Sequence, residues 1–573
     1  MNAMSRPATG SVVVVGAGPT GLTLANLLGG YGVSVDVLEA APALCDHPRA
    51  VGIDDESMRV FQSAGLLDAV LPHTGPDHAM RFLGMNGKPI AEIAPGMGPY
   101  GFSRRNSFIQ PLVDDELLAG LDRFPHVRVH FGHTCVAVEQ DEDEVRVRSR
   151  GPDGVLDRRC SYVVGADGGK SSVRKALGVP FEGSTEATRW LVVDIDGDPL
   201  GTPDLYVGCD PRRPYVSIQL PHGVRRLELM LRPGEDRGLV DDPDRLRVLL
   251  RPFVPYADRL DVVRARVYTH HARIAGRFRS GRVLLAGDAA HLMPVWQGQG
   301  YNSGIRDAAN LAWKLAAVTR GHGEDALLDT YDAERRPHVA AMVRLSTLVG
   351  RIISPTRRPV AALRDAVFRA LDAVPAAKRY VTEMRFKPMP RYESGAVAHP
   401  RTPPPRDSPV GRMFPQPRVA TREGTVLRLD DVLGGWFAVL VWCNPLELVF
   451  DERVRARWRA LGARVIEVRP MSQLAWRSAT EDATHGTVVG DVDGDVKRWF
   501  DGRPVGVLVI RPDRIVAGAA LAQECEDLAA AVARATRLEA TRPEPDHAFG
   551  RTPVPMAGTS TAHVGTPPKG LES

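Results

Sequence analysis

The sequence predicts an α/β protein in which a Rossmann-type nucleotide-binding domain is interrupted by a mostly antiparallel β-sheet and followed by a smaller α/β domain. Three patterns predict this fold class: a strand, glycine turn, helix and strand near the start, a run of short strands within 188–275, and a proline-rich stretch at 399–418. At 573 residues the chain also exceeds the length at which one hydrophobic core stops growing. Two or three domains are therefore expected.

The opening pattern is the strongest local signal. "SVVVV", "GAGPTG", "LTLANLLGGYG" and "VSVDVLE" follow one another over residues 11–39 and form a βαβ unit. Gly16 permits the tight turn, Gly18 lets the backbone approach a pyrophosphate, Gly21 allows helix and strand to pack closely, and Glu39 is placed to accept hydrogen bonds from ribose hydroxyls. A glycine turn without a ligand is the alternative, and the flanking strands and the acid favour nucleotide binding.

Two later segments repeat the arrangement of a strand that ends in polar residues. "SYVVGADGGKSSVRKALG" places Asp167 after a strand, and "GRVLLAGDAAHLMPVWQGQGYN" places Asp288 after another, before an irregular loop and a long helix. An aspartate and a glycine after a strand are by themselves more often just a turn. Asp288, however, lies at the carboxyl end of its strand, where open α/β sheets bind ligands.

The remaining chain divides by composition. Short strands separated by Gly, Pro and Asp predict the inserted sheet, and the proline-rich stretch predicts a linker. The last α/β domain resembles a thioredoxin-like domain without a CxxC pair, since Cys443 has no second cysteine nearby, which favours a structural or oligomerising role. The expected boundaries are 10–187 and 276–398 for the nucleotide-binding domain with its helical region, 188–275 for the sheet, 399–420 for the linker, 421–540 for the last domain and 541–573 for a poorly ordered tail.

Composition limits the partners of the chain. A net charge of +4 is small for this length, and the arginines are scattered among acidic residues, so neither nucleic acid nor an anionic membrane is indicated. The six cysteines include no CxxC pair, which argues against zinc, a dithiol centre and a disulfide framework. No apolar run is long enough for a membrane span or a signal core. We expect a cytoplasmic protein without a metal.

The three nucleotide-type motifs together resemble one family. "GAGPTG" with Glu39, "GADGG" around Asp167, and "GDAAHLMPVWQGQGYN" are similar to the motifs of class A, single-component FAD-dependent aromatic hydroxylases. The resemblance is strong over roughly residues 10–390 and includes "HPRAVGIDDE", "RRNSFIQP" and "EMRFKPMP". It implies FAD as cofactor, NADH as co-substrate, O2 as oxidant and a small phenolic acid as substrate.

The resemblance also assigns residues to the cofactor site. Asp288 is suited to accept a hydrogen bond from a ribityl hydroxyl, and the glycine-rich loop after it can approach the flavin ring edge. The long helix after this loop points its positive end towards the ring, which favours an anionic reduced flavin. The cofactor residues expected in addition to the opening motif are Arg49, Gln110, Asp167, Asp288, Gly298, Gly300, Tyr301 and Asn302.

The substrate side is less well defined. Several tyrosines and histidines of the inserted sheet are candidates, and most must be ordinary core or surface residues. Tyr206 and Arg226 are the preferred catalytic pair, with Arg226 as a clamp for the substrate carboxylate. Val51 stands where related phenol hydroxylases carry an acid, so a phenol-activating aspartate cannot be assigned there. No second dinucleotide motif follows residue 40, so NADH is expected to bind transiently.

Other readings remain open at this point. A hydroxylase of another phenolic substrate would carry the same motifs. An NAD-dependent dehydrogenase would share the first βαβ unit, but the Asp167 and Asp288 motifs disfavour it. The intact cofactor motifs also argue against a non-catalytic interaction protein, and the motifs expected of a flavin halogenase are not evident. The oligomeric state is not fixed by the sequence, with a homodimer among the alternatives.

Overall fold

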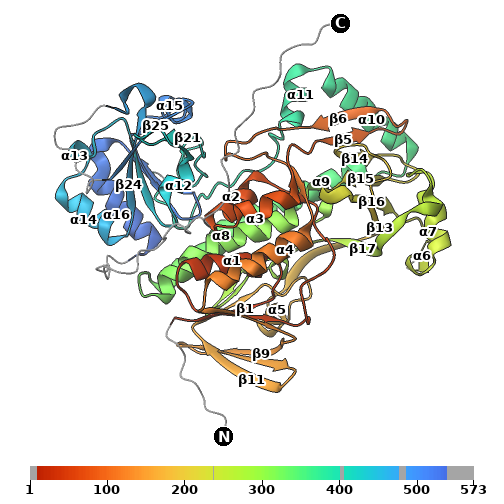
Figure 1. Ribbon diagram of the computed structural model, residues 1–573, viewed down its shortest axis with the longest axis horizontal. Coiled ribbons are helices and arrows are strands. Elements are labelled where there is room, and N and C mark those ends of the chain that lie inside the picture. Colours follow the sequence, from red (N-terminus) through yellow and green to blue (C-terminus); the bar gives the residue numbers. More distant parts are fainter. Residues whose placement is uncertain (1–9, 236–237, 401–404, 476–485, 539–573) are drawn as a thin grey trace.

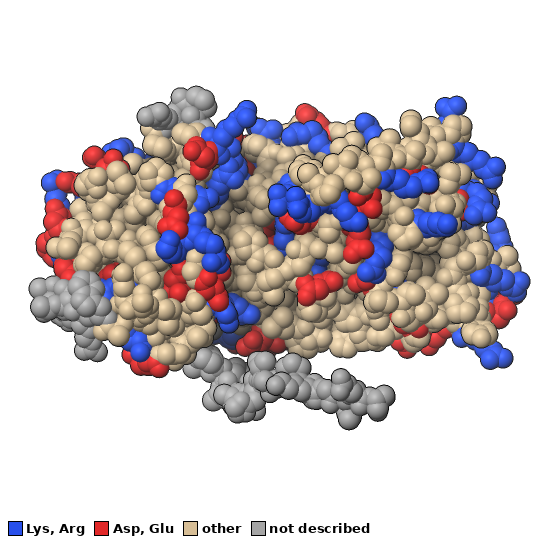
Figure 2. Space-filling model, turned by 90° about the horizontal axis from the view of Figure 1, so that it is seen from above, with Lys and Arg blue, Asp and Glu red and all other residues tan. Residues whose placement is uncertain are grey.

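The computed structural model describes residues 10–235, 238–400, 405–475 and 486–538 (Figure 1). A six-stranded sheet lies at the centre, an eight-stranded sheet lies to one side of it, and a seven-stranded sheet, drawn in blue, lies to the other. The predicted tail falls outside the described residues. None of the helices in the described part has both the length and the apolar character needed to cross a bilayer. Acidic and basic side chains are interspersed on the face shown in Figure 2.

The central sheet has the strand order β18-β19-β12-β1-β2-β8. β1 pairs in parallel with both β12 and β2, and all four of its valines are buried, as expected for a parallel strand covered on both faces. Helices α1 and α8 lie against each other over this sheet (Figure 1). The elements are β1 (Val12–Val15), α1 (Pro19–Gly30), β2 (Val35–Glu39), β8 (Val127–Phe131), β12 (Tyr162–Gly165), α5 (Ser172–Ala176), β18 (Arg279–Ser280), β19 (Val283–Leu285) and α8 (Gln299–Thr319).

Between β2 and β12 the chain adds small elements that border the cofactor loops. A three-stranded sheet with the order β3-β7-β4 precedes α4, and a second one, β11-β10-β9, forms the lower edge in Figure 1. Asp54 caps α2 by accepting a hydrogen bond from the amide of Ser57 at 3.1 Å. The elements are β3 (Gly52–Ile53), α2 (Asp55–Ser63), α3 (Leu67–Val70), β4 (Thr74–Gly75), β7 (Asn106–Phe108), α4 (Gln110–Ala119), β9 (Thr134–Gln140), β10 (Val145–Gly151) and β11 (Gly154–Cys160).

The inserted sheet is mostly antiparallel, as predicted, and has the order β20-β17-β13-β16-β15-β14-β5-β6. Only the pairing of β14 with β5 is parallel. The hairpin of β5 and β6 comes from residues before the predicted insertion, so this sheet is wider than the strand pattern of 188–275 indicated. The elements are β5 (Met80–Leu83), β6 (Pro89–Ile93), β13 (Phe181–Asp196), β14 (Leu205–Gly208), β15 (Tyr215–Gln219), β16 (Arg225–Met230), α6 (Gly238–Asp241), α7 (Pro243–Leu250), β17 (Asp261–Ala275) and β20 (His291–Leu292).

Three helices follow α8 and support the inserted sheet. α9 (Asp329–Ile353) contacts β17, while α10 (Arg358–Asp372) and α11 (Pro375–Thr382) contact β6. The apolar side chains between these helices and the sheet include Trp296 and Ile353, which are buried. The helices therefore close one side of the region where the two sheets meet.

The last domain is built on a sheet with the order β22-β21-β25-β24-β23-β26-β27. Its three middle strands β25, β24 and β23 are parallel, and the outer pairings are antiparallel. β21 lies inside the segment predicted as a linker, so the sheet begins before residue 421. The elements are β21 (Arg418–Ala420), β22 (Val426–Arg428), α12 (Leu429–Leu433), β23 (Ala438–Trp442), α13 (Leu446–Val449), α14 (Glu452–Ala460), β24 (Arg464–Pro470), β25 (Thr487–Asp491), α15 (Asp495–Asp501), β26 (Val507–Ile510), β27 (Val516–Ala520) and α16 (Cys525–Thr536).

Buried ion pairs attach this domain to the central one. Arg59 of α2 binds Asp430 of α12 through two hydrogen bonds of 2.7 Å, and Arg511 binds Glu334 of α9 at 2.7 and 2.9 Å. Trp313 of α8 also belongs to the apolar core of the last domain. The interface is therefore continuous with the interior of both domains.

Candidate functional site

A cavity of about 860 Å³ lies where the central sheet meets the inserted sheet. The carboxyl ends of β1, β2, β12 and β19 open into it, which is where open α/β sheets bind ligands. Its volume lies within the range of roughly 300–1,000 Å³ that ligand and cofactor pockets occupy. Of the predicted cofactor residues, all but Gly21 line this cavity.

The glycines of the opening motif differ in what surrounds them. Gly16 has a φ of +110°, a backbone conformation that favours glycine. A Cβ on Gly21 would lie 2.0 Å from the carbonyl oxygen of Gly16, so Gly21 serves the packing of α1 on the turn. A Cβ on Gly18 would meet no atom within 4 Å and would point into open space at the start of α1. The site thus leaves room at Gly18 for a group that contacts the backbone.

Glu39 ends β2 at the rim of the cavity. One oxygen of its carboxylate accepts a hydrogen bond from the amide of Ala17 at 2.8 Å, and the other accepts from Ala41 at 2.9 Å. These bonds fix the carboxylate beside the glycine turn. Carboxylate oxygens have further lone pairs, so Glu39 can still accept from a ribose hydroxyl.

Asp288 lies in the 3₁₀ turn Gly287–Ala289 that follows β19. Its carboxylate lines the cavity and accepts no hydrogen bond from the described residues. Burial raises the pKa of Asp288, and the nearby charges of His291 and Arg49 oppose this shift. An unpartnered acceptor at this place suits a ligand hydroxyl.

A buried network that the sequence did not reveal holds the turn before Asp288. Asp307 of α8 accepts hydrogen bonds from the amide of Gly287 at 3.0 Å, from Nε2 of His291 at 2.7 Å and from Nε of Arg335 at 2.8 Å. All three side chains are fully buried. The helix that follows the loop therefore positions the loop.

The glycine-rich loop before α8 is fixed by Asn302. Its Nδ2 donates to the carbonyl oxygens of Gly298 at 2.6 Å and Gly52 at 3.1 Å, and its Oδ1 accepts from the amide of Asp54 at 3.0 Å. Gly298 has a φ of +62°, and Gly300 has only Met293 near its Cβ position. Gly298 and Gly300 thus leave the backbone accessible from the cavity, where Tyr301 also lines the wall.

Gln110 and Asp167 line the cavity and also accept hydrogen bonds from backbone amides. Oε1 of Gln110 accepts hydrogen bonds from the amides of Arg49 and Ala50 at 3.0 and 2.8 Å. Asp167 accepts from the amide of Ser172 at 2.6 Å and so fixes the start of α5. The guanidinium of Arg49 has no hydrogen bond or ion pair within the described ranges and lines the cavity.

The residues that line the cavity fit FAD. The open space at Gly18 and the start of α1 suit a pyrophosphate, and the guanidinium of Arg49 is available for its charge. The unpartnered carboxylate of Asp288 suits the ribityl chain, and the glycine-rich loop suits the ring edge. The chain therefore has the donors, acceptors and clearance that FAD needs.

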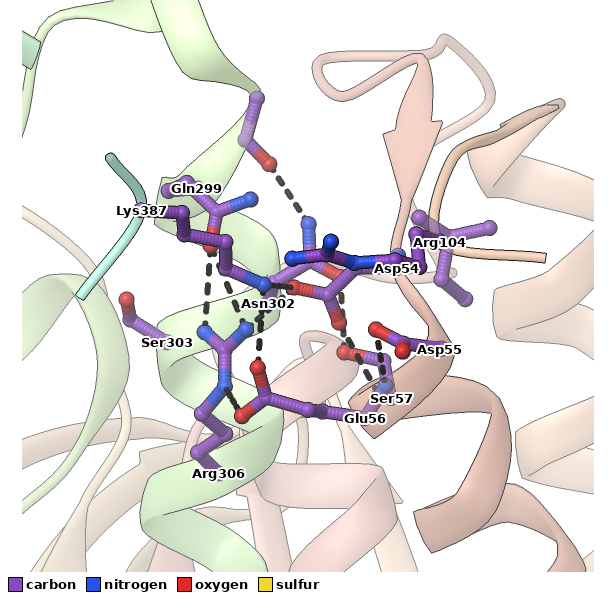
Figure 3. Close-up of polar contacts among 12 residues, drawn as sticks. Asp54, Asp55, Glu56, Ser57, Arg104, Gln299, Asn302, Ser303, Arg306 and Lys387 are labelled. Carbon is purple, nitrogen blue, oxygen red and sulfur yellow. Dashed lines mark hydrogen bonds and ion pairs between the residues drawn. The ribbon is translucent and has the colours of Figure 1, made fainter. Parts of the chain in front are cut away.

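Beside this loop lies a buried cluster of charges (Figure 3). Arg306 of α8 binds Glu56 at 2.6 Å and also contacts Asp54, while Lys387 binds Asp54 at 2.8 Å and Glu56 at 3.0 Å. Burial alone would raise the pKa of Asp54 and Glu56, but the two cations lower both below their usual values. The segments "GIDDE" and "EMRFKPMP" carry three of these four charges, although nothing local in either indicates their pairing.

Asp55 is the acidic residue of this region whose carboxylate is not fully paired. Its Oδ2 is buried and has no hydrogen-bond partner among the described residues. Burial, with the charges of Asp54 and Glu56, raises the pKa of Asp55 to about 7, while Lys387 and Arg104 oppose the shift. Below about pH 7 the neutral carboxyl is therefore the form that the folded chain favours.

This raised pKa gives a prediction for stability against pH. Between about pH 4 and pH 7 the folded chain holds a proton on Asp55 that the unfolded chain has lost, so this group makes stability fall as the pH rises. Asp55→Asn is expected to resemble the wild type near pH 5 and to be more stable at pH 8. Urea unfolding at both pH values checks this, and an equal stability difference at the two would contradict it.

A group of three side chains outside the predicted set is compatible with a metal. One ligand atom of each of Cys45, Asp46 and His47 lies within 4.8 Å of the others. They are consecutive residues, and Asp46 is exposed, an arrangement that also occurs without an ion. The expectation that the chain carries no metal therefore stays a prediction.

The inserted sheet forms the other wall of the cavity. Its polar end carries Glu228, Tyr268 and His270, and apolar side chains of β14, β15 and β5 continue the wall. The hydroxyl of Tyr268 donates to Glu228 at 2.8 Å and lies 3.4 Å from Nε2 of His270. Burial and the neighbouring charge of Glu228 raise the pKa of Tyr268 well above its usual value, so its hydroxyl keeps its proton.

Neither member of the predicted catalytic pair lines this cavity. Leu205 and Val207 of β14 face it, so Tyr206 between them points to the opposite face, where Nη1 of Arg81 lies 3.4 Å from its hydroxyl. Arg226 binds Asp194 at 2.7 and 2.9 Å and donates to the carbonyl oxygen of Pro48 at 2.6 Å. Alternation along the strand and this ion pair separate both side chains from the space a substrate would occupy.

Comparisons with known proteins show which family the chain belongs to. Residues 9–346 match the FAD binding domain family, and residues 411–535 match the HcaD C-terminal domain. A 3-(3-hydroxy-phenyl)propionate/3-hydroxycinnamic acid hydroxylase of Mycolicibacterium smegmatis is 56% identical over 92% of this chain and 94% of its own length. One of the same name from Mycobacterium avium is 54% identical, covering 94% of each chain.

Solved structures place the fold in the same group. The structure of aklavinone-11 hydroxylase in a ternary complex with FAD and aklavinone aligns with a TM-score of 0.75 at 26% identity, covering 93% of this chain and 100% of the other. The thioredoxin-like resemblance of the last domain stays a prediction. Because the family match spans more than half of the chain and the relatives match nearly all of it, the chain belongs to the FAD-dependent aromatic hydroxylases, monooxygenases built on this FAD-binding domain.

Proposed function

We propose that the chain hydroxylates 3-(3-hydroxyphenyl)propionate and 3-hydroxycinnamate next to the phenol, giving the 2,3-dihydroxy products, with NADH and O2 in aromatic catabolism. The similarity to hydroxylases of that name over nearly the whole chain carries this proposal. A cofactor cavity that continues into a partly apolar wall with one polar end supports it, because the substrate has an apolar ring and a phenol. All six cysteines are free, which supports a reducing, cytoplasmic setting.

The chemistry divides between cofactor and protein. Bound FAD, reduced by NADH, supplies the activation of O2 that inserts one oxygen atom into an electron-rich ring. Gly18, Arg49, Asp288 and Asn302 would hold the cofactor at the carboxyl edge of the central sheet. The protein then has to orient the phenol, exclude water and draw the phenol proton away from the ring.

We infer that Glu228 receives the phenol hydrogen bond. Its carboxylate is buried at the cavity wall, and Tyr268 donates to it from the side. His270 continues this group, since its Nδ1 lies 3.3 Å from Glu186, whose side chain is 36% exposed. A proton accepted at Glu228 therefore has a series of polar side chains leading towards solvent. Sharing the phenol proton raises electron density on the ring.

Glu228→Gln is expected to lower kcat by roughly 100- to 10,000-fold at neutral pH, the range typical for removal of a general base. Activity of the variant should recover towards pH 10, because the phenol of the substrate then ionises by itself at about pH 10. Glu182→Gln, which changes an exposed carboxylate of β13, is the matched control. A kcat that stays low at every pH would contradict the role of Glu228.

The reaction itself is tested with purified holoenzyme under air. NADH consumption is followed with 3-(3-hydroxyphenyl)propionate present, and the product mass is measured in the same sample. A catechol one oxygen heavier, formed in step with NADH loss, is the expected result. NADH loss that yields only hydrogen peroxide would refute the substrate and leave the flavin enzyme intact, and NADPH in place of NADH tests the co-substrate.

A further inference from the structure

Arg105 lies on the cavity wall directly before β7 and is held rigidly. Its carbonyl oxygen accepts hydrogen bonds from the amide of His78 at 3.1 Å and from the hydroxyl of Ser103 at 3.0 Å. Its Nε donates to the carbonyl oxygen of His78 at 3.2 Å. The backbone and Nε of Arg105 are therefore fixed by these bonds. Its two terminal amino groups take no part in them.

Those two amino groups have no hydrogen bond or ion pair with any residue that the structure describes. Burial lowers the pKa of Arg105 to about 10, so the side chain still carries its charge at neutral pH. Arg105 is half-buried, and a charge held partly out of water without a counter-ion is costly, so proteins normally pair it. The unpaired guanidinium is thus a place where an anion from outside the chain would be favourable.

The neighbouring side chains do not supply that counter-ion. Burial, followed by the charge of Arg105, lowers the pKa of His78 to about 4, so His78 is neutral. Asp204 acts on His78 but is itself paired with Arg81 and accepts a hydrogen bond from the amide of Ala79 at 3.2 Å. Arg104, the other arginine of this segment, donates to the carbonyl oxygen of Glu383 at 2.6 Å.

The wall of the cavity places Arg105 and Glu228 at opposite ends. Glu228 lies on β16, and the strands β15, β14 and β5 follow in that order across the sheet. The side chains of these strands that line the cavity are apolar: Val216, Ile218, Leu205, Val207 and Met80. His78 lies two residues before β5 and contacts Arg105. The wall therefore presents an acid, an apolar strip and a cation in sequence.

We propose that Arg105 binds the carboxylate of an arylalkanoate substrate whose phenol lies at Glu228. This assignment rests on the proposed function and names the residue that selects for an acid. A phenol, an aromatic ring and a carboxylate at the far end of a short alkyl chain match the order of groups along the wall. Arg226, the clamp predicted from the sequence, is occupied by Asp194 and the carbonyl oxygen of Pro48.

The test compares two ligands that differ only in charge. The dissociation constants of 3-(3-hydroxyphenyl)propionate and of its primary amide are measured by the change in flavin absorbance of the holoenzyme. Arg105→Met is expected to weaken binding of the acid roughly 10- to 100-fold, the effect of losing a charge-assisted hydrogen-bonded pair, and to leave the amide unchanged. Arg105→Lys should fall between, because lysine keeps the charge but loses the bidentate geometry.

Arg212→Met is the matched control, since Arg212 is an exposed arginine in the turn between β14 and β15. It should change neither constant. Equal weakening of both ligands by Arg105→Met, or no weakening of the acid, would overturn the proposal. If Arg105→Met loses its flavin, Arg105→Lys and Arg105→Gln decide in its place: both must lower the preference for the acid over the amide, and an unchanged preference would overturn the proposal.

Failure of the proposed function would look different. In that case the wild type would form no catechol from 3-(3-hydroxyphenyl)propionate, whatever its dissociation constant. The preference for the acid over the amide and its dependence on Arg105 are binding measurements and do not require turnover. Product analysis therefore tests the proposed function, and the two-ligand titration tests the role of Arg105. Either proposal can fail without the other.

Discussion

Replacement of Asp307 by alanine is expected to lower the free energy of unfolding by about 3–5 kcal/mol, the cost of removing one partner from a buried ion pair. The variant would leave Arg335 without its carboxylate partner in the described part of the chain, and it would free the amide of Gly287. Because that amide fixes the turn before Asp288, flavin should also be lost more easily. Urea unfolding of the apoprotein measures the first effect, and flavin content after gel filtration measures the second.

Asp244→Ala is the control for this variant. It removes an aspartate that pairs with Arg247 on the surface of α7, where the carboxylate is 92% exposed. Exposed pairs of this kind contribute roughly 0–1 kcal/mol, so a small change is expected. If Asp307→Ala cost no more than this control, the buried network would not be what holds the loop.

Substitution of Gly18 by alanine is expected to weaken FAD binding by roughly 100-fold, about 2.8 kcal/mol, without destabilising the apoprotein. The new methyl group meets no protein atom within 4 Å, but it occupies the space that a pyrophosphate needs at the start of α1. Fluorescence titration of the apoprotein with FAD gives the affinity, and thermal unfolding of the apoprotein gives the stability.

Two other glycines of α1 distinguish a loss of space for FAD from a loss of protein stability. Gly30→Ala adds the same methyl group at the exposed end of α1, again with no atom within 4 Å, and should bind FAD normally. Gly21→Ala should instead destabilise the apoprotein, because its Cβ would lie 2.0 Å from the carbonyl oxygen of Gly16. Normal FAD affinity in Gly18→Ala would mean that the pyrophosphate lies elsewhere.

The residues expected on the cofactor side, apart from Gly21, line the cavity as a group, and their signals in the sequence are local. Strand, glycine turn and helix follow one another in the sequence, so Gly16, Gly18 and Glu39 come together without any long-range pairing. Asp288 is fixed in the same way by its place after β19. The supporting network of Asp307, His291 and Arg335 carries no such local signal, because α9 supplies one of its members.

Two physical reasons explain why neither Tyr206 nor Arg226, the predicted catalytic pair, lines the cavity. Tyr206 and its neighbours alternate between the faces of β14, and the sequence does not say which face meets the cavity. Arg226 is paired with Asp194 of β13, and that register depends on the whole sheet. Arg105 lies within the motif "RRNSFIQP", but its unpaired charge becomes visible only when the segment before β5 is placed beside it.

The ion pairs at Asp430 and Glu334 would be broken if the chain were cut between its two domains. Each joins side chains that are 177 or more positions apart in sequence, across the boundary that the proline-rich segment marks. A cut there would leave Arg59 and Glu334 in one fragment and their partners in the other. It would also expose the apolar surface of Trp313 to solvent. We therefore expect the two domains to unfold in one cooperative transition, and the last domain to add to the stability of the cofactor-binding half.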